Sequence, residues 1–418
     1  MLAEDLHKGI MNAPLLTLDD IQLNDAEADQ WYECMVHTIT RIIVNHGGPG
    51  FNRWRTDMEK CQPVTADKIE VHKTNVHPLP AFEIDESSIV GNVEVNDSID
   101  DELKLDPDNP DYNRLVRINA GDQLTQARQR AILGICGGHE DAARAYLGRV
   151  FMPGLFHGKM TDIHGLLETH FGKPHAGNRS PGGLAYHNKC LDRLPIVLSS
   201  LPAFSTARDL VMVSLYARVL HCLLLVSGKA SLDEYIETVT SWDALYSHAR
   251  LIYERYANAD KVQEMRERRI PEEMQREAAQ KVAQKVVRKA AREAAKRASE
   301  RSGTNTSAPI ATEIEDELPA NGPQLPKSSP LPHVKAGDMV FENAQLLLRD
   351  QLISREFADA VKCGDSGRIV VVLKIWACSF RGHGRTKYAH EMLHIIHNLT
   401  HVWTKGLRYV VIPYSLIN

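Results

Sequence analysis

The sequence lacks any C-x-x-C pair, and its seven cysteines are scattered and odd in number. This pattern argues against a disulfide framework and against a cysteine-based zinc site, and it is typical of a reducing compartment. An excess of charge of one sign is also lacking, because 49 lysines and arginines nearly balance 54 aspartates and glutamates. The net charge of −5 therefore indicates no particular class of partner.

A long uninterrupted apolar run is missing as well. The longest candidate, residues 210–227, contains Ser214, Arg218 and His221, and charged side chains are costly in the centre of a bilayer. We predict a buried core helix there and no membrane span. The first residues, MLAEDLHKGI, are charged where a secretion signal would be apolar. We therefore expect an intracellular protein of the nucleus or cytoplasm that is not secreted.

The 418 residues are 43% hydrophobic, which is enough for two or three domains. Charge is unevenly distributed: an acidic, turn-rich stretch at 83–111 is expected to be solvated, whereas 261–301 and 361–410 are basic. We divide the chain into a helical N-terminal region, a core in two parts, and a basic helix with a linker inserted between those parts. The N-terminal region is 1–78, the first core part is 79–260, the insertion is 261–336 and the second core part is 337–418.

Apolar spacing and capping residues predict an α-rich α/β fold that is mostly helical with a small central sheet. Ser205 or Thr206 is expected to cap the helix that ends before Gly228, and Ser231 to open the next one with a capping box. The segment 302–333 is expected to be a disordered linker. The predicted helices are 26–45, 208–227, 231–251 and a projecting basic helix at 271–300, and the predicted strands are 114–120 and 149–157. For 369–380 we favour a helix because of its length and because Asp365 can cap it, and its β-branched run leaves a strand as the alternative.

The first candidate site is Gly121-Asp122-Gln123-Leu124-Thr125, which follows a predicted strand. An aspartate at such a position can hold a hard cation such as Mg²⁺ through its oxygens. The alternative is that Asp122 caps the following helix by accepting backbone amides.

The second candidate is His157 in the segment MPGLFHGKM. As the ionisable group of an apolar stretch, it could transfer protons or bind a metal. The alternative is an imidazole that is buried and hydrogen-bonded to backbone.

The third candidate is a set of basic residues in glycine-containing segments near the C-terminus. Glycine lets backbone amides approach an anion, and Arg368, Arg381, Arg385 and Lys387 supply positive charge, so these residues could bind phosphates. Ordinary loop and helix-start roles are the alternative.

The fourth candidate is His390-Glu391-Met392-Leu393-His394, which matches the zinc-peptidase pattern H-E-x-x-H. His390, His394, His397 and His401 form one stripe of an amphipathic helix, which the pattern predicts well. A third protein ligand is not evident, because no aspartate or glutamate follows Glu391. We favour the polar face of a packed helix over a peptidase.

Together these segments resemble a family of mushroom-forming fungi that is defined only as a domain of unknown function. The resemblance implies an aromatic residue in relatives at position 390 and a continuation beyond Asn418 with further acidic residues. It also implies a mobile-element origin and a reduced ribonuclease-H-like core. In such a core, Asp122 and Glu391 would be carboxylates of a metal-dependent site. Phe156 stands where a further aspartate of that site would be expected. The matching stretches include GDQLT (121–125), MPGLFHGKM (152–160), SLYARVLHCLLLVSG (214–228) and REFADAVKCGDSGR (355–368).

Three functions follow from these observations. The leading hypothesis is a transposon-derived protein that contacts nucleic acid, with Asp122, His157 and Glu391 at the site and the four basic residues on phosphates. The second is a non-enzymatic scaffold that binds a protein partner through the helix at 271–300. The third is the zinc peptidase.

Overall fold

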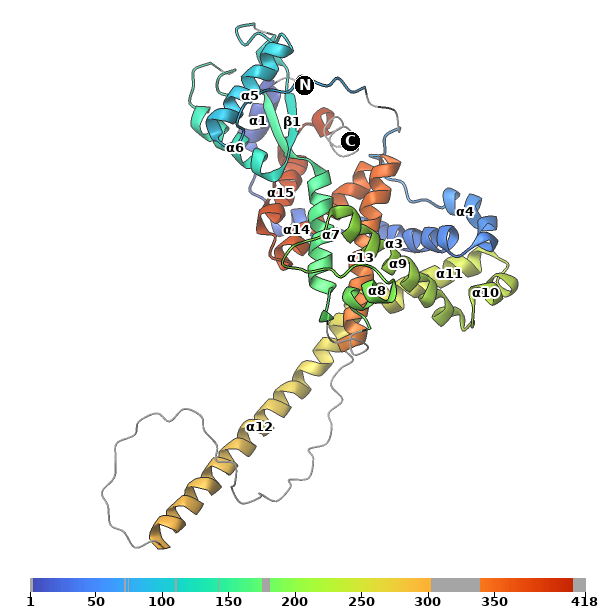
Figure 1. The fold of residues 1–418 in the computed structure, drawn as a ribbon. Helices are drawn as coiled ribbons and strands as arrows, with labels where there is room; N and C mark the ends of the chain where they lie inside the picture. Colours follow the sequence, from blue (N-terminus) through green and yellow to red (C-terminus); the bar gives the residue numbers. More distant parts are fainter. Residues whose placement is uncertain are drawn as a thin grey trace. The chain divides into compact units, whose positions relative to one another are not determined.

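The computed structural model describes two compact units, one made of residues 1–258 and 343–418 and the other of residues 259–342. Helices dominate, and the described residues contain one sheet of two parallel strands (Figure 1). The α-rich α/β prediction is confirmed, whereas nothing in this small sheet confirms a ribonuclease-H-like core. The described residues are 3–70, 73, 75–109, 111–141, 143–174, 181–301 and 339–408.

The two strands are β1 (Arg117–Gly121) and β2 (Arg149–Pro153), and β2 is buried along its whole length. Their register pairs Arg117 with Arg149 and Gly121 with Pro153. The second strand was predicted to run to residue 157, but helix α7 (Leu155–His170) already begins after Gly154. Proline has no N–H for the ladder, so Pro153 is a natural last residue for the strand.

One part of the core is formed by α3 (Asp25–His46), α9 (Phe204–Ser227) and α11 (Trp242–Ile252). Asn24 caps α3 by accepting the Glu27 amide at 2.9 Å, and the Glu27 carboxylate accepts the Asn24 amide at 3.0 Å. Helix α9 is long and apolar enough to cross a membrane by length and composition. It lies in the core instead, as predicted, because it packs against α3, α7 and α11.

Two details of this region were predicted wrongly. Helix α9 begins at Phe204 after Ala203, so neither Ser205 nor Thr206 is its cap. The helix predicted at 231–251 is interrupted after α10 (Leu232–Thr238), and α11 starts anew under a Ser241 cap. Ser231 does cap α10 by accepting the Glu234 amide, but the Glu234 carboxylate accepts the amide of Ala230 rather than that of Ser231.

A second part of the core is formed by α13 (Met339–Cys363), α14 (Ser366–Gly382) and α15 (Thr386–His397) around the buried side chains of Trp376 and Phe380. Asp365 caps α14 by accepting the Arg368 amide at 3.2 Å, and the helix predicted at 369–380 is confirmed.

The acidic stretch is more ordered than predicted. It contains helix α5 (Ile89–Glu102), which packs against α6 (Gln123–Cys136). Asp100 in α5 is buried, and its carboxylate accepts hydrogen bonds from Arg149 and from the Tyr112 hydroxyl. The expectation of a solvated segment was wrong here, because an internal arginine compensates for the buried carboxylate.

The basic helix is α12 (Ala259–Arg301), which starts before the predicted Pro271 and is drawn as one continuous helix in Figure 1. The linker predicted at 302–333 lies outside the described residues. The remaining α-helices are α1 (Ala3–Asn12), α2 (Leu18–Ile21), α4 (Arg55–Lys60) and α8 (Leu184–Cys190).

Candidate nucleic-acid interface

An aromatic pair, one ring exposed and the other half-buried, lies where the first turn of α7 meets the start of α9. Phe156 is 55% exposed, although its neighbour Leu155 is buried in the core and anchors this turn. The rings of Phe156 and Phe204 meet edge to face, with centroids 5.6 Å apart. The loop before α9 is held to α7 because His164 Nε2 donates to the Pro202 carbonyl at 3.2 Å. A large aromatic ring is therefore presented to solvent on a fixed support.

Two cations flank this pair. Lys159 Nζ lies 6.0 Å and Arg208 Cζ lies 5.8 Å from the centroid of the Phe204 ring. The pKa of Lys159 is lowered, first by its partial burial and then by the positive charges of Arg208 and Lys362. Arg208 also pairs with Asp209 at 2.8 Å, but both side chains are exposed and such a pair is weak. We call Phe156, Lys159, Phe204 and Arg208 the aromatic–cationic surface.

The chemistry of this surface suits a planar, anionic ligand. An exposed phenylalanine offers a face on which a nucleobase can stack, and neighbouring lysine and arginine side chains can contact the phosphates. These cations repel one another, so an anion placed among them would be stabilised.

Asp122 and His157 lie near this surface. The Asp122 carboxylate caps α6 by accepting the Thr125 amide at 2.7 Å, as the simpler of our two interpretations expects. The pKa of Asp122 is lowered, chiefly by this hydrogen bond and to a smaller extent by the charge of His157. His157 is half-buried, and its ring meets that of Phe156 edge-on at 5.8 Å.

Glu391 has a different environment. It is buried on α15, and both of its carboxylate oxygens accept from the guanidinium of Arg130, one of them at 2.9 Å. Arg130 stands eight residues after Asp122, or about 12 Å further along α6. Among the described residues, no three histidine, cysteine, aspartate or glutamate side chains converge on a metal site. Asp122 therefore lies near His157, whereas Glu391 forms an ion pair with Arg130. The three side chains do not come together as the predicted Mg²⁺ site.

The four predicted phosphate contacts differ in accessibility. Arg381 and Lys387 are exposed at the junction of α14 and α15. Arg385 is half-buried and pairs with Glu168 at 2.8 Å. Arg368 is buried, with its side chain 1% exposed and paired with Glu356 at 2.6 Å. Arg368 was therefore wrongly predicted to contact phosphate, because a side chain enclosed in this way cannot reach one.

The histidine stripe runs from α15 into the π-helical turn Asn398–Val402, and two of its four side chains bind other groups. His390 and His394 are exposed, whereas His397 Nε2 donates to the Pro14 carbonyl at 2.8 Å and His401 pairs with Asp20 at 2.8 Å. A peptidase would need Glu391 free to activate a water molecule, but Arg130 binds it. This geometry gives the peptidase interpretation no support.

In the other unit, α12 carries its own basic face. Lys281, Lys285, Arg288 and Lys289 are exposed, and at 100° per residue they fall in a sector of about 100°. Val282 and Val286 are 61% and 62% exposed and lie on the next sector around the helix. The helix is therefore amphipathic within the basic segment.

The sequence analysis predicted no site role for Lys159, Phe204 or Arg208. It described Phe156 only as standing where an acidic residue would be expected. A usable signal was present: Phe156 and Lys159 are separated by three residues, and Phe204 and Arg208 by four. Both spacings place an aromatic ring and a cation on one face of a helix.

Comparison with known proteins adds a family but no activity. No curated protein and no solved structure matches the chain. The profile of one family of unknown function, DUF6589, matches residues 11–418, which is nearly the whole chain. The chain belongs to the family DUF6589.

Proposed function

We propose that this chain binds single-stranded nucleic acid on the aromatic–cationic surface. The observation that supports the proposal is the exposed ring of Phe156, which packs edge to face on Phe204, together with Lys159 and Arg208, which lie 6.0 and 5.8 Å from the centroid of the Phe204 ring. Stacking on aromatic rings needs unpaired bases, since the bases of a duplex cover one another. A single strand is therefore the expected form, and little sequence preference is expected.

The proposal concerns binding and not strand cleavage. A two-metal nuclease holds its ions between converging carboxylates, and Glu391 is instead neutralised by Arg130. Mobile-element ancestry, which the resemblance implied, stays a prediction.

Replacing Phe156 with alanine is expected to weaken binding of a labelled oligothymidylate by about 1–3 kcal/mol, the usual contribution of one base stacked on an aromatic ring. The dependence of affinity on salt should stay the same, because the phosphate contacts remain. Replacing Lys159 with glutamine should weaken binding and also reduce the slope of log K against log salt by about 0.7. Fluorescence anisotropy at several salt concentrations measures both quantities.

Leu225→Ala is the matched control, because Leu225 is 50% exposed on α9 but lies about 30 Å from Phe204 along that helix. Arg381→Gln with Lys387→Gln tests the other exposed basic residues. Affinity that depends on Arg381 and Lys387 but not on Phe156 would place the interface at the junction of α14 and α15 and refute this proposal. Binding that is absent or insensitive to salt would refute nucleic-acid association altogether.

A scaffold function is the alternative, and the exposed valines of α12 favour it. Val282, Val286 and Val287 are 48–62% exposed and lie within two turns of α12, so they give this helix an apolar stripe that a partner surface could cover. If α12 pairs with the α12 of a second copy, Val282→Glu with Val286→Glu should convert a dimer to a monomer in sedimentation velocity. Lys285→Glu, on the basic face, is the control. A chain that is monomeric at all accessible concentrations would contradict this form of the scaffold hypothesis.

A further inference from the structure

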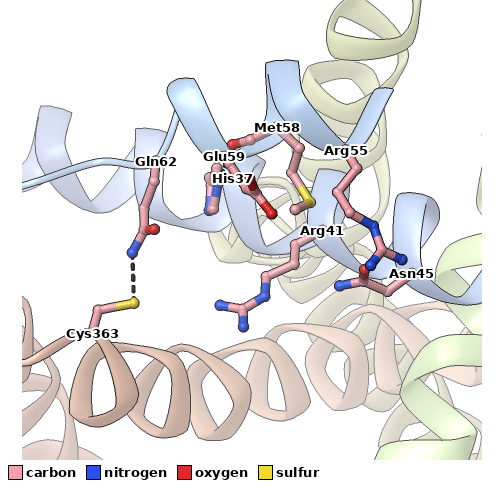
Figure 2. A pocket seen from close by; sticks show the side chains of 8 residues that line it. All are labelled: His37, Arg41, Asn45, Arg55, Met58, Glu59, Gln62 and Cys363. Atoms are coloured by element: carbon pink, nitrogen blue, oxygen red, sulfur yellow. Dashed lines mark hydrogen bonds between the residues drawn. The ribbon is translucent and has the colours of Figure 1, made fainter. Parts of the chain in front are cut away.

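A polar pocket of about 310 Å³ opens where α3 and α4 meet the C-terminal end of α13. It is separate from the aromatic–cationic surface and lies within the unit formed by residues 1–258 and 343–418. Figure 2 shows Arg55 and Asn45 together at one end, Gln62 and Cys363 at the other, and Arg41 and Glu59 between them.

The two arginines keep hydrogen-bonding capacity. Arg41 is 25% exposed on its side chain and lies 3.3 Å from the carboxylate of Asp359. Asp359 is shared with Arg355, which it meets at 3.0 Å, so one negative charge serves two guanidinium groups. Arg55 is exposed and donates to the Asn52 side chain at 3.0 Å. A guanidinium has five N–H donors, and these contacts use only some of them.

The rest of the pocket contributes amides and one carboxylate. His37 adds no positive charge at neutral pH, because burial lowers its pKa to about 4, and its Nε2 lies 3.0 Å from the Met58 carbonyl. The Gln62 amide donates to the thiol of Cys363 at 2.6 Å. The charged lining side chains are therefore two arginines and Glu59, which gives an excess of positive charge.

We infer that this pocket binds a small phosphate monoester, with Arg41 and Arg55 supplying the positive charge that attracts the phosphate and Glu59 and Gln62 supplying polar contacts for the organic part. A phosphate has several oxygens that point in different directions, so it can accept from two guanidinium groups and an amide at once. Glu59 can then accept a hydroxyl of the organic part. The volume is at the lower end of the range for ligand pockets, about 300–1,000 Å³, and this fits a sugar phosphate or a mononucleotide rather than a polymer.

Isothermal titration of the full chain tests the inference with inorganic phosphate, ribose 5-phosphate, adenosine monophosphate and the phosphate-free compounds ribose and adenosine. At least one phosphate monoester should bind more tightly than inorganic phosphate, and neither phosphate-free compound should bind. Arg55→Gln should weaken that affinity about tenfold, because it removes a charge-assisted contact. Glu59→Gln should strengthen it severalfold, because the glutamine oxygen can still accept the ligand hydroxyl whereas the negative charge that repels the anion is removed. Lys60→Gln changes the same charge on the same helix outside the lining and should leave the affinity unchanged.

Cys363 supplies an independent readout, because it lines the pocket. A bound phosphate monoester should slow its alkylation by iodoacetamide, measured residue by residue by mass spectrometry, and Arg55→Gln should abolish this protection. Cys190 and Cys378 are exposed elsewhere and serve as internal references. The inference is overturned if none of the phosphate compounds binds, if Lys60→Gln weakens binding as much as Arg55→Gln does, or if Cys363 is alkylated at one rate with and without ligand. Loss of nucleic-acid binding by Phe156→Ala would leave all of these results unchanged, so the two proposals fail separately.

Discussion

Replacing Arg368 with methionine is expected to lower the free energy of unfolding by about 3–5 kcal/mol, because it leaves a buried carboxylate without its partner. Glu356 is 1% exposed, and it accepts from Arg368 Nε at 2.7 Å and from the Thr38 hydroxyl at 2.8 Å. These contacts join α3, α13 and α14 at the centre of the fold. Urea unfolding followed by circular dichroism measures the loss.

Adding Glu356→Leu to Arg368→Met is expected to recover much of the lost stability, since the uncompensated charge is then removed as well. Recovery should be incomplete, because the Thr38 hydroxyl loses its acceptor. If Arg368→Met instead unfolded like the wild type and lost only affinity for nucleic acid, Arg368 would be a phosphate contact after all. A stable single variant would contradict the structural role that its burial assigns.

Asp162→Asn is expected to make the protein more stable at pH 8 and to flatten its stability between pH 5 and 8. Asp162 is buried on α7 and accepts from the Ser354 hydroxyl, and burial raises the pKa of its carboxyl from 3.8 to about 7. In the unfolded chain the same group loses its proton near pH 4. Between pH 4 and pH 7 only the native state holds this proton, so stability falls as the pH rises through that window.

The size of the effect follows from the difference between the two pKa values. Three pH units at about 1.4 kcal/mol each give an upper limit of about 4 kcal/mol by pH 8. The measurement is the difference in unfolding free energy between wild type and variant at each pH. Contributions from groups that titrate in both proteins, such as the half-buried His383, cancel in this difference. The charges of Asp350 and Arg385 also act on this carboxyl, with opposite signs. Parallel profiles for the two proteins would mean that Asp162 is ionised in the native state.

Local sequence signals predicted much of the fold. Apolar spacing predicted α3 closely, and in the structure a capping box at Asn24 and Glu27 and a cap at Asp365 set where α3 and α14 start. The break between α10 and α11 was missed, because apolar spacing continues through Val239 while the chain turns there. The burial of Asp100 was missed too, because its partner Arg149 is 49 residues away.

The sites were harder to predict for the same reason. The capping role of Asp122 could be read from its neighbours, whereas the partner of Glu391 is 261 residues distant. The pocket gathers side chains from α3, α4 and the end of α13, and no motif spans such separations. Caps that join neighbouring residues could be predicted from the sequence, whereas ion pairs and a pocket that join distant residues could not.

Asp365 caps α14 and also binds the segment around Thr65, and this second contact affects how the chain folds while it is being synthesised. Its carboxylate accepts from the Thr65 amide at 3.0 Å and from the Thr65 hydroxyl, and the Ile69 amide donates to the Gly364 carbonyl at 2.9 Å. Because some 300 residues separate these partners, the early segment stays without them until Gly364 and Asp365 have left the ribosome. During translation the apolar face of α3 lacks part of its final covering, and a nascent chain in that condition is a natural client for chaperones.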